Sequence, residues 1–177
     1  MQITNSENRF GIIAILLHWI MAILLIGLLI LGLYMTQLPI SLEKLKLYGW
    51  HKEYGMLALM LVMVRIVWRL TNILPTLSIP WWEKVAARTV HWAFYVFMFA
   101  MPITGWIITS AAGLPVSFFG LFVLPNLMAP NPDVMEVFQE VHEWLGYGLI
   151  ATIVLHTSAA LKHHFIDKDD ILKRMLS

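Results

Sequence analysis

The chain has 177 residues, of which 59% are hydrophobic and 13% are charged, and its formal net charge is +1. Soluble domains carry about 25% charged residues, so this composition indicates a polytopic membrane protein in which residues 1–177 form one membrane domain. We expect no nucleic-acid partner, and the absence of cysteine excludes disulfides, thiolate metal sites and haem attached through cysteine.

The first half of the chain predicts two membrane spans. The first covers about 12–35, and His18 lies about two turns inside it. Its apolar run is longer than the ~7–15 residues of a signal-peptide core, so we expect a membrane helix there rather than a cleaved leader. The second span covers about 50–70, begins with His51 and carries Arg65 near its far end.

The second half predicts two more spans. The third covers about 85–110 and has His91 in its opening turns, and the fourth covers about 138–163 and precedes a charged tail. The uncharged stretch VSFFGLFVLPNLM lies between them, in a region that glycine and proline interrupt. We therefore expect an interfacial or partly re-entrant loop there rather than a fifth helix. The predicted fold class is all-α, a four-helix membrane bundle.

Lysine and arginine are distributed unevenly over the two sides of this bundle. The side of the two termini and the second connection holds Arg9, Arg65, Arg69, Lys84, Arg88, Lys162, Lys168, Lys173 and Arg174. The opposite side holds Lys44, Lys46 and Lys52. By the positive-inside rule, we expect both termini in the cytoplasm.

The fourth span carries two histidines on one face. His142 and His156 lie 14 residues apart, which on an α-helix places both rings on the same side, separated by ~21 Å along the axis. Imidazoles inside a membrane are costly unless something binds them. This helix is therefore expected to serve two sites at different depths.

Two other histidines match these depths. His51 and His142 each open a helix at the outer face, whereas His18 and His156 both lie about two turns from the inner face. Six-coordinate haem b takes two axial imidazoles, which helix bundles supply from facing helices. We therefore predict two haem b groups, with His51 and His142 as ligands of the outer iron and His18 and His156 as ligands of the inner iron.

Small residues and one arginine support this assignment. His51 and His142 are each followed four residues later by glycine, and Gly32 lies at the depth of the outer pair. Glycine lets a flat ligand approach the backbone closely. Arg65 follows His51 by 14 residues, at the depth of the inner pair, where its guanidinium suits a haem propionate.

Less specialised roles are open for several of these residues. For His91, His163 and His164 the default role is at the membrane interface, and Arg69 is equally consistent with a snorkelling side chain. Glycine in membrane helices often serves packing alone. The seven histidines and eleven methionines also raise the alternative of a metal transporter.

Taken in order, the motifs resemble one family, the bacterial cytochrome b561 proteins. They are LHW, GWHKEYG, LMLVMVRIVWR, HWAFYVFMFAMPITGW, FFGLFVLP and HEWLGYGLIATIVLHTSAALKHHF, and together they cover the chain. The family is part of a wider class of four-helix di-haem b proteins that includes cytochrome b subunits of formate dehydrogenases and nickel–iron hydrogenases. In such proteins helices 1, 2 and 4 supply the ligands, which implies the same pairing of His18, His51, His142 and His156.

The resemblance also implies a function. Such proteins move electrons between the outer face and the quinone pool, and some resemble a superoxide oxidase that passes an electron to ubiquinone. On this basis superoxide or a periplasmic redox protein is the expected donor, and Lys44, Lys46 and Lys52 would attract the anion. The residues expected near the quinone and the inner haem are His91, Lys84, Arg88 and His163. The alternative is a haem-bearing membrane anchor subunit of a periplasmic dehydrogenase or hydrogenase.

Overall fold

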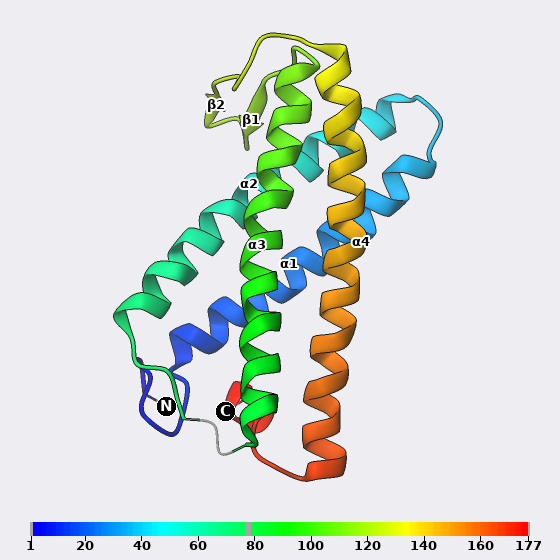
Figure 1. Ribbon diagram of the computed structural model, residues 1–177. Coiled ribbons are helices and arrows are strands. Elements are labelled where there is room, and N and C mark those ends of the chain that lie inside the picture. Colours follow the sequence, from blue (N-terminus) through cyan, green and yellow to red (C-terminus); the bar gives the residue numbers. More distant parts are fainter. Residues whose placement is uncertain (1, 77–78, 177) are drawn as a thin grey trace.

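The computed structural model describes residues 2–76 and 79–176. Within this part of the chain it has long helices α1 (Ile12–Gln37), α2 (Leu42–Thr71), α3 (Trp81–Ala111) and α4 (Pro132–Lys162). All of them are long and apolar enough to cross a membrane. The predicted four-helix membrane bundle is therefore confirmed (Figure 1).

Three helices begin earlier than the sequence pattern indicated. α3 begins at Trp81 rather than near residue 85. α2 begins at Leu42 rather than near residue 50, because the Ser41 hydroxyl caps it by accepting a hydrogen bond from the Lys44 N–H at 3.1 Å. α4 begins at Pro132 rather than near residue 138, because the Asn131 side chain accepts from two N–H groups of the first turn. The 30 residues of α2 extend over about 45 Å, so its polar first turns lie beyond the ~30 Å hydrocarbon core.

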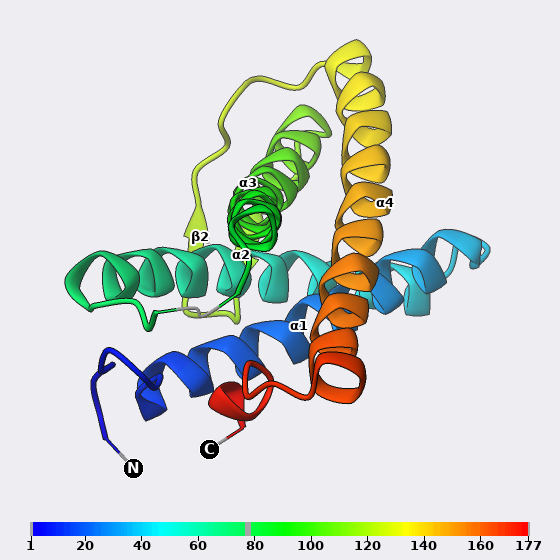
Figure 2. The same ribbon diagram turned by 60° about the horizontal axis from the view of Figure 1, so that its bottom comes forward.

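The helices form two hairpins that cross. α1 packs against α2 and α3 packs against α4, and α2 joins the two hairpins through its contact with α3. Figures 1 and 2 show the α1–α2 pair running obliquely across the α3–α4 pair. Both chain ends lie at the same end of the bundle (Figure 1), as an even number of spans requires.

The connection from α3 to α4 contains a small β-hairpin. Strands β1 (Val116–Phe118) and β2 (Phe122–Leu124) pair antiparallel, and Gly120 turns the chain with a positive φ of 72°. β1 packs against α2 and α3, while Leu121 and Val123 stay exposed. In the described residues this stretch does not cross the membrane, which agrees with the predicted interfacial loop. The pattern of the sequence had not indicated strands.

The buried core is small and lies at mid-depth. Met21, Val62 and Met98, from three different helices, form its centre. Most other large apolar side chains face outward, as expected where lipid rather than water surrounds the helices.

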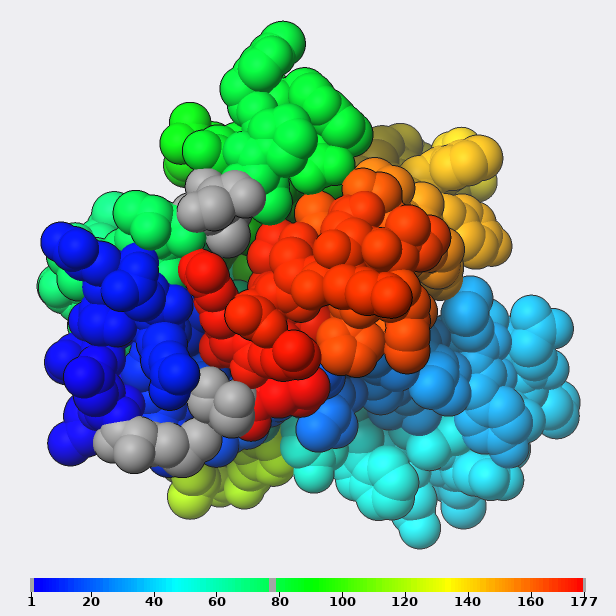
Figure 3. All heavy atoms as spheres, turned by 90° about the horizontal axis from the view of Figure 1, so that it is seen from below, coloured from blue at the N-terminus to red at the C-terminus, as the bar shows by residue number. Residues whose placement is uncertain are grey.

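The C-terminal tail folds back under the bundle. The indole N–H of Trp19 donates to the Met175 carbonyl at 2.7 Å, and the Arg174 guanidinium donates to the Thr76 carbonyl at 2.9 Å. Seen from below in Figure 3, the tail fills the space between the N-terminal segment and the end of α4. The tail therefore ties the first and last helices together at this end.

The fold and the charge bias together predict the orientation in the membrane. A green fluorescent protein fused after Ser177 should fluoresce in the cytoplasm, because nine of the twelve lysines and arginines lie at that end. Alkaline phosphatase inserted after Asn126, between the hairpin and α4, should be active. The reverse pattern, an active phosphatase at the C-terminus, would contradict the predicted topology.

Candidate functional site

The structure brings the predicted outer histidines together. His51 on α2 and His142 on α4 face each other with 6.3 Å between their ring centroids and a 76° angle between the ring planes. The two rings come from helices of different hairpins, and these hairpins cross (Figure 1). The pair is therefore a product of the tertiary fold.

Glycines on the other two helices make room for these rings. A Cβ added at Gly32 on α1 would lie 3.3 Å from Cε1 of His51, and one added at Gly105 on α3 would lie 3.5 Å from Cε1 of His142. Each imidazole thus rests on a stretch of bare backbone. Any larger residue at Gly32 would push against His51, since 3.3 Å is already a tight contact.

Polar contacts differ between the two outer rings. The Thr104 hydroxyl on α3 lies 2.8 Å from Nδ1 of His142. Nδ1 of His51, by contrast, is buried and has no hydrogen-bond partner among the described residues. The role of Thr104 was not predicted, because an isolated threonine in an apolar span has no sequence signal beyond its depth.

An apolar cleft opens beside the outer pair. It encloses about 610 Å³, its open mouth included, and His51, Lys52, Gly105 and His142 are among its lining residues. A second groove, lined by aliphatic side chains of α1 and α4, runs close by and shares Leu29 with the cleft. Together they leave apolar space between the two hairpins beside the outer imidazoles.

The inner site gathers three histidines rather than two. His18 on α1 lies 6.2 Å from His156 on α4, and His91 on α3 lies 5.9 Å from the same ring, measured between centroids. Phe94, one turn after His91, contacts His156 edge to face at 5.3 Å. The predicted pair is present, and His91 joins it instead of lying at the membrane interface, its default role.

Arg65 also lies at the inner site, as its spacing from His51 predicted. Its Nη2 is 3.2 Å from Nδ1 of His18, and its Nη1 is 4.0 Å from the sulfur of Met21. A guanidinium can only donate, so in this arrangement Nδ1 accepts and the ring proton of neutral His18 is on Nε2. Ligation of a metal through Nε2 would require Arg65 to leave this nitrogen.

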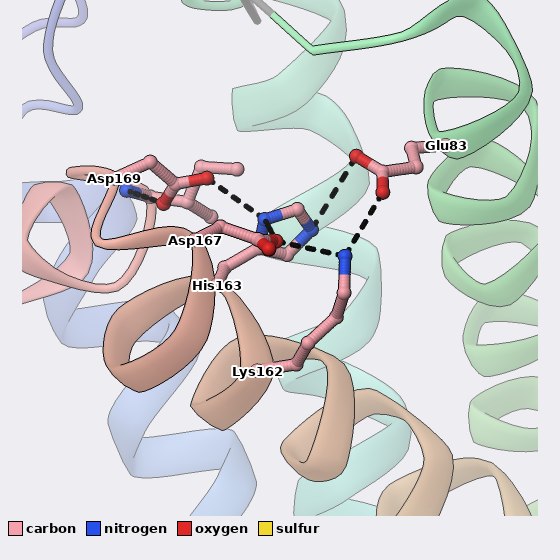
Figure 4. A network of polar contacts seen from close by, with 6 residues as sticks. Glu83, Lys162, His163, Asp167 and Asp169 are labelled. Carbon is pink, nitrogen blue, oxygen red and sulfur yellow. Dashed lines mark hydrogen bonds and ion pairs between the residues drawn. The ribbon is translucent and has the colours of Figure 1, made fainter.

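His163 lies apart from the histidine cluster, in an ionic network at the end of the bundle that the charges predict to be cytoplasmic (Figure 4). His163 follows α4 in a short π-helical turn, η1 (His163–Asp167). Its Nδ1 lies 2.8 Å from Asp169 and 3.1 Å from Asp167, and Lys162 bridges Glu83 at 3.0 Å and Asp167 at 2.8 Å. Lys162 thus already supplies a cation between two of these carboxylates.

Lys84 and Arg88 lie on the first turns of α3, and the Arg88 side chain is exposed. The residue of these turns that reaches His163 is Glu83, at 4.0 Å, which was not a candidate. The candidates for a quinone region therefore fall into two groups, His91 in the histidine cluster and His163 in the ionic network, with Lys84 and Arg88 beside the latter on the chain.

The outer level fits a pair of metal-bound imidazoles, and the inner level fits one once Arg65 leaves Nδ1 of His18. A metal–imidazole bond is about 2 Å long, so one ion between two facing rings accounts for centroids 6.2 and 6.3 Å apart. The partnerless Nδ1 of His51, the bare backbone at Gly32 and Gly105 and the apolar cleft suit a flat, mostly apolar group. In a chain without cysteine, haem b meets these conditions.

Comparisons with known proteins identify one family. A model of the family described as prokaryotic cytochrome b561 matches residues 9–177. The chain is 37% identical over 186 residues to "Cytochrome b561 homolog 2" of Escherichia coli (strain K12), covering 99% of this chain and 95% of that protein. It is 29% identical to "Cytochrome b561 homolog 1" of the same organism, over 96% of this chain and 97% of that protein.

A third relative has a more specific name. "Probable superoxide oxidase CybB" of Yersinia pestis is 31% identical over 128 residues, which cover 71% of this chain and 72% of that protein. The family match includes all four membrane helices and both histidine levels. The chain therefore belongs to the prokaryotic cytochrome b561 family of membrane electron-transfer proteins.

Proposed function

We propose that this multi-pass protein of the bacterial inner membrane is a di-haem b cytochrome that transfers electrons between an outer donor and the quinone pool. The observation that carries the proposal is the pairing of four histidines at two depths, His51 with His142 and His18 with His156. Haem b bound at each level supplies a one-electron iron couple. The protein supplies the axial imidazoles, the spacing between levels and the local charge.

Arg65 is proposed to hold a propionate at the inner level. Its side chain is partly buried and already lies 3.2 Å from His18. A guanidinium presents a planar set of donors that matches a carboxylate. Moving from the imidazole to a carboxylate would also free Nδ1 of His18 to carry the ring proton, which leaves Nε2 as a metal ligand.

Ubiquinone is proposed to react near the inner level. Its reduction takes two electrons and two protons, so hydrogen-bond donors and a route for protons are needed at that end. His91 packs against His156, and His163 lies among carboxylates at the bundle end. These two residues, with Lys84 and Arg88, form the proposed quinone region.

Superoxide is the proposed outer donor, with a periplasmic redox protein as the alternative. The similarity to a relative named as a probable superoxide oxidase supports the first. Lys44, Lys46 and Lys52 all lie on the first part of α2, at the end of the bundle that carries the β-hairpin (Figure 1). Lys52 also lines the outer cleft, so its charge is placed to attract an anion there.

The first test is haem content. The purified protein should show a reduced-minus-oxidised spectrum of b-type haem, with two haems per chain by pyridine haemochrome assay. Replacing His51 or His142 by alanine should lower the ratio to one, because each haem loses an axial ligand, and so should replacing His18 or His156. A protein that stays colourless when haem is supplied would overturn the proposal and favour a metal transporter.

His91 provides the sharpest test of the inner pairing, because it lies as close to His156 as His18 does. His91→Ala should keep two haems per chain and slow quinone reduction, whereas His18→Ala should lose the inner haem. The pairing is wrong if the result is reversed, with the inner haem lost in the His91 variant and retained in the His18 variant.

The donor is tested by superoxide-dependent reduction of ubiquinone in proteoliposomes. Lys52→Gln should lower the second-order rate constant by about 2–10-fold at low salt and weaken its dependence on ionic strength, since fewer charges steer the anion. Lys168→Gln, at the opposite end of the bundle, is the control and should match the parent protein. If superoxide gives no reduction above the uncatalysed rate while a periplasmic partner co-purifies and reduces both haems, the donor is that partner.

A further inference from the structure

We infer that Thr104 is a positioning residue for the outer site: its hydroxyl fixes the tautomer of His142 and makes Nε2 the nitrogen available for iron. The inference rests on the proposed function, because it concerns a ligand of the proposed outer haem. The inference goes beyond the proposed function because it gives α3, which carries no predicted haem ligand, a role in setting the reduction potential and retention of the outer haem.

The direction of the hydrogen bond follows from counting protons. The Thr104 hydroxyl has a single hydrogen, and its oxygen lies 2.8 Å from the Ala100 carbonyl and 2.9 Å from the Met101 carbonyl. Both carbonyl oxygens can only accept, so they take this hydrogen. Towards Nδ1 of His142, at 2.8 Å, the hydroxyl oxygen is therefore an acceptor. Nδ1 consequently carries the ring proton, and the lone pair of the neutral imidazole is on Nε2.

The surroundings make this arrangement rigid. Thr104 is 6% exposed, so water does not compete for its hydroxyl. The next residue is Gly105, whose missing side chain lets the His142 ring approach the helix, with Cε1 3.5 Å from the position of a Cβ. The Thr104 hydroxyl thus contacts Nδ1 of His142, and the backbone at Gly105 leaves room for the neighbouring Cε1.

The other ring of the outer pair provides an internal comparison. Nδ1 of His51 has no hydrogen-bond partner among the described residues. The two outer imidazoles are therefore held differently. Removing the Thr104 hydroxyl would leave His142 with the Met101 backbone carbonyl as its remaining hydrogen-bond acceptor. The effect of Thr104 should be confined to the outer site.

The chemical consequence concerns the reduction potential. A metal-bound imidazole that donates its second N–H to an acceptor is a more basic ligand than one that does not. A more basic ligand stabilises ferric iron relative to ferrous iron. Thr104 should therefore lower the potential of the outer haem.

The test is a spectroelectrochemical titration of the purified di-haem protein and three variants. Thr104→Val removes the hydroxyl at nearly constant shape and should raise the midpoint potential of the outer haem while leaving that of the inner haem unchanged. Thr104→Ser keeps the hydroxyl and should restore the parent value. Thr152→Val is the matched control, because the Thr152 hydroxyl also bonds the carbonyl four residues earlier, at 2.8 Å, and should shift neither haem.

Haem retention is the second readout, because the valine variant could bind the outer haem too weakly for a titration. Loss of an outer-shell partner typically lowers metal affinity by about 10–100-fold, so the outer haem should dissociate faster to apomyoglobin in Thr104→Val and at the parent rate in Thr104→Ser. The inference is overturned if Thr104→Val keeps both the parent potential and the parent dissociation rate. It is also overturned if the serine and valine variants behave alike, or if Thr152→Val shows the same loss.

These outcomes are separable from failure of the proposed function. If the parent protein does not hold two haems, the proposed function fails before any variant is compared. If the parent holds two and the Thr104 variants do not differ from it, only the role of Thr104 is rejected.

Discussion

An imidazole inside a bilayer cannot take its hydrogen-bond partners from water, and this constraint organises the whole molecule. Five of the described histidines lie within the membrane helices and converge on two depths, where they face one another. Burying such polar groups is unfavourable unless they are bonded. A metal ion that binds the imidazole nitrogens at the outer and inner levels would therefore stabilise the fold.

The crossing of the two helix hairpins brings histidines from different hairpins together at both depths. Here α1 and α4 carry the inner pair, yet these helices have little direct contact along their length, and aliphatic side chains line the groove between them. The small core of Met21, Val62 and Met98 holds the helices together at mid-depth. Apolar space is left beside the outer pair, and the groove between α1 and α4 shares Leu29 with it.

Much of this could be predicted from the sequence, because helical spacing and membrane depth are one-dimensional quantities. The four spans, the two histidine pairs and the depth of Arg65 all follow from counting residues along straight helices. The family assignment is likewise confirmed. The haem ligation inferred from the pairs stays a prediction.

Two kinds of feature could not be predicted. One is the rotation of each helix about its axis, and the other is the side-chain hydrogen bonds that cap the helix ends. Ser41 and Asn131 start α2 and α4 early through single side-chain bonds, which hydropathy does not register. His91 was assigned to the interface by default, yet α3 turns it toward His156. Thr104 and Glu83 act through partners on α4, the helix farther along the chain, so no local pattern marks them.

The position of α4 in the chain has a consequence for biogenesis. It provides one histidine to each level and is synthesised after α1, α2 and α3. Until it inserts, each level has half of its imidazole pair, and the cleft beside the outer pair lacks one wall. Both sites are thus completed in a single late step, so on the proposed assignment cofactor loading follows the insertion of the full chain. A nascent chain halted after α3 would lack one ligand of each predicted pair.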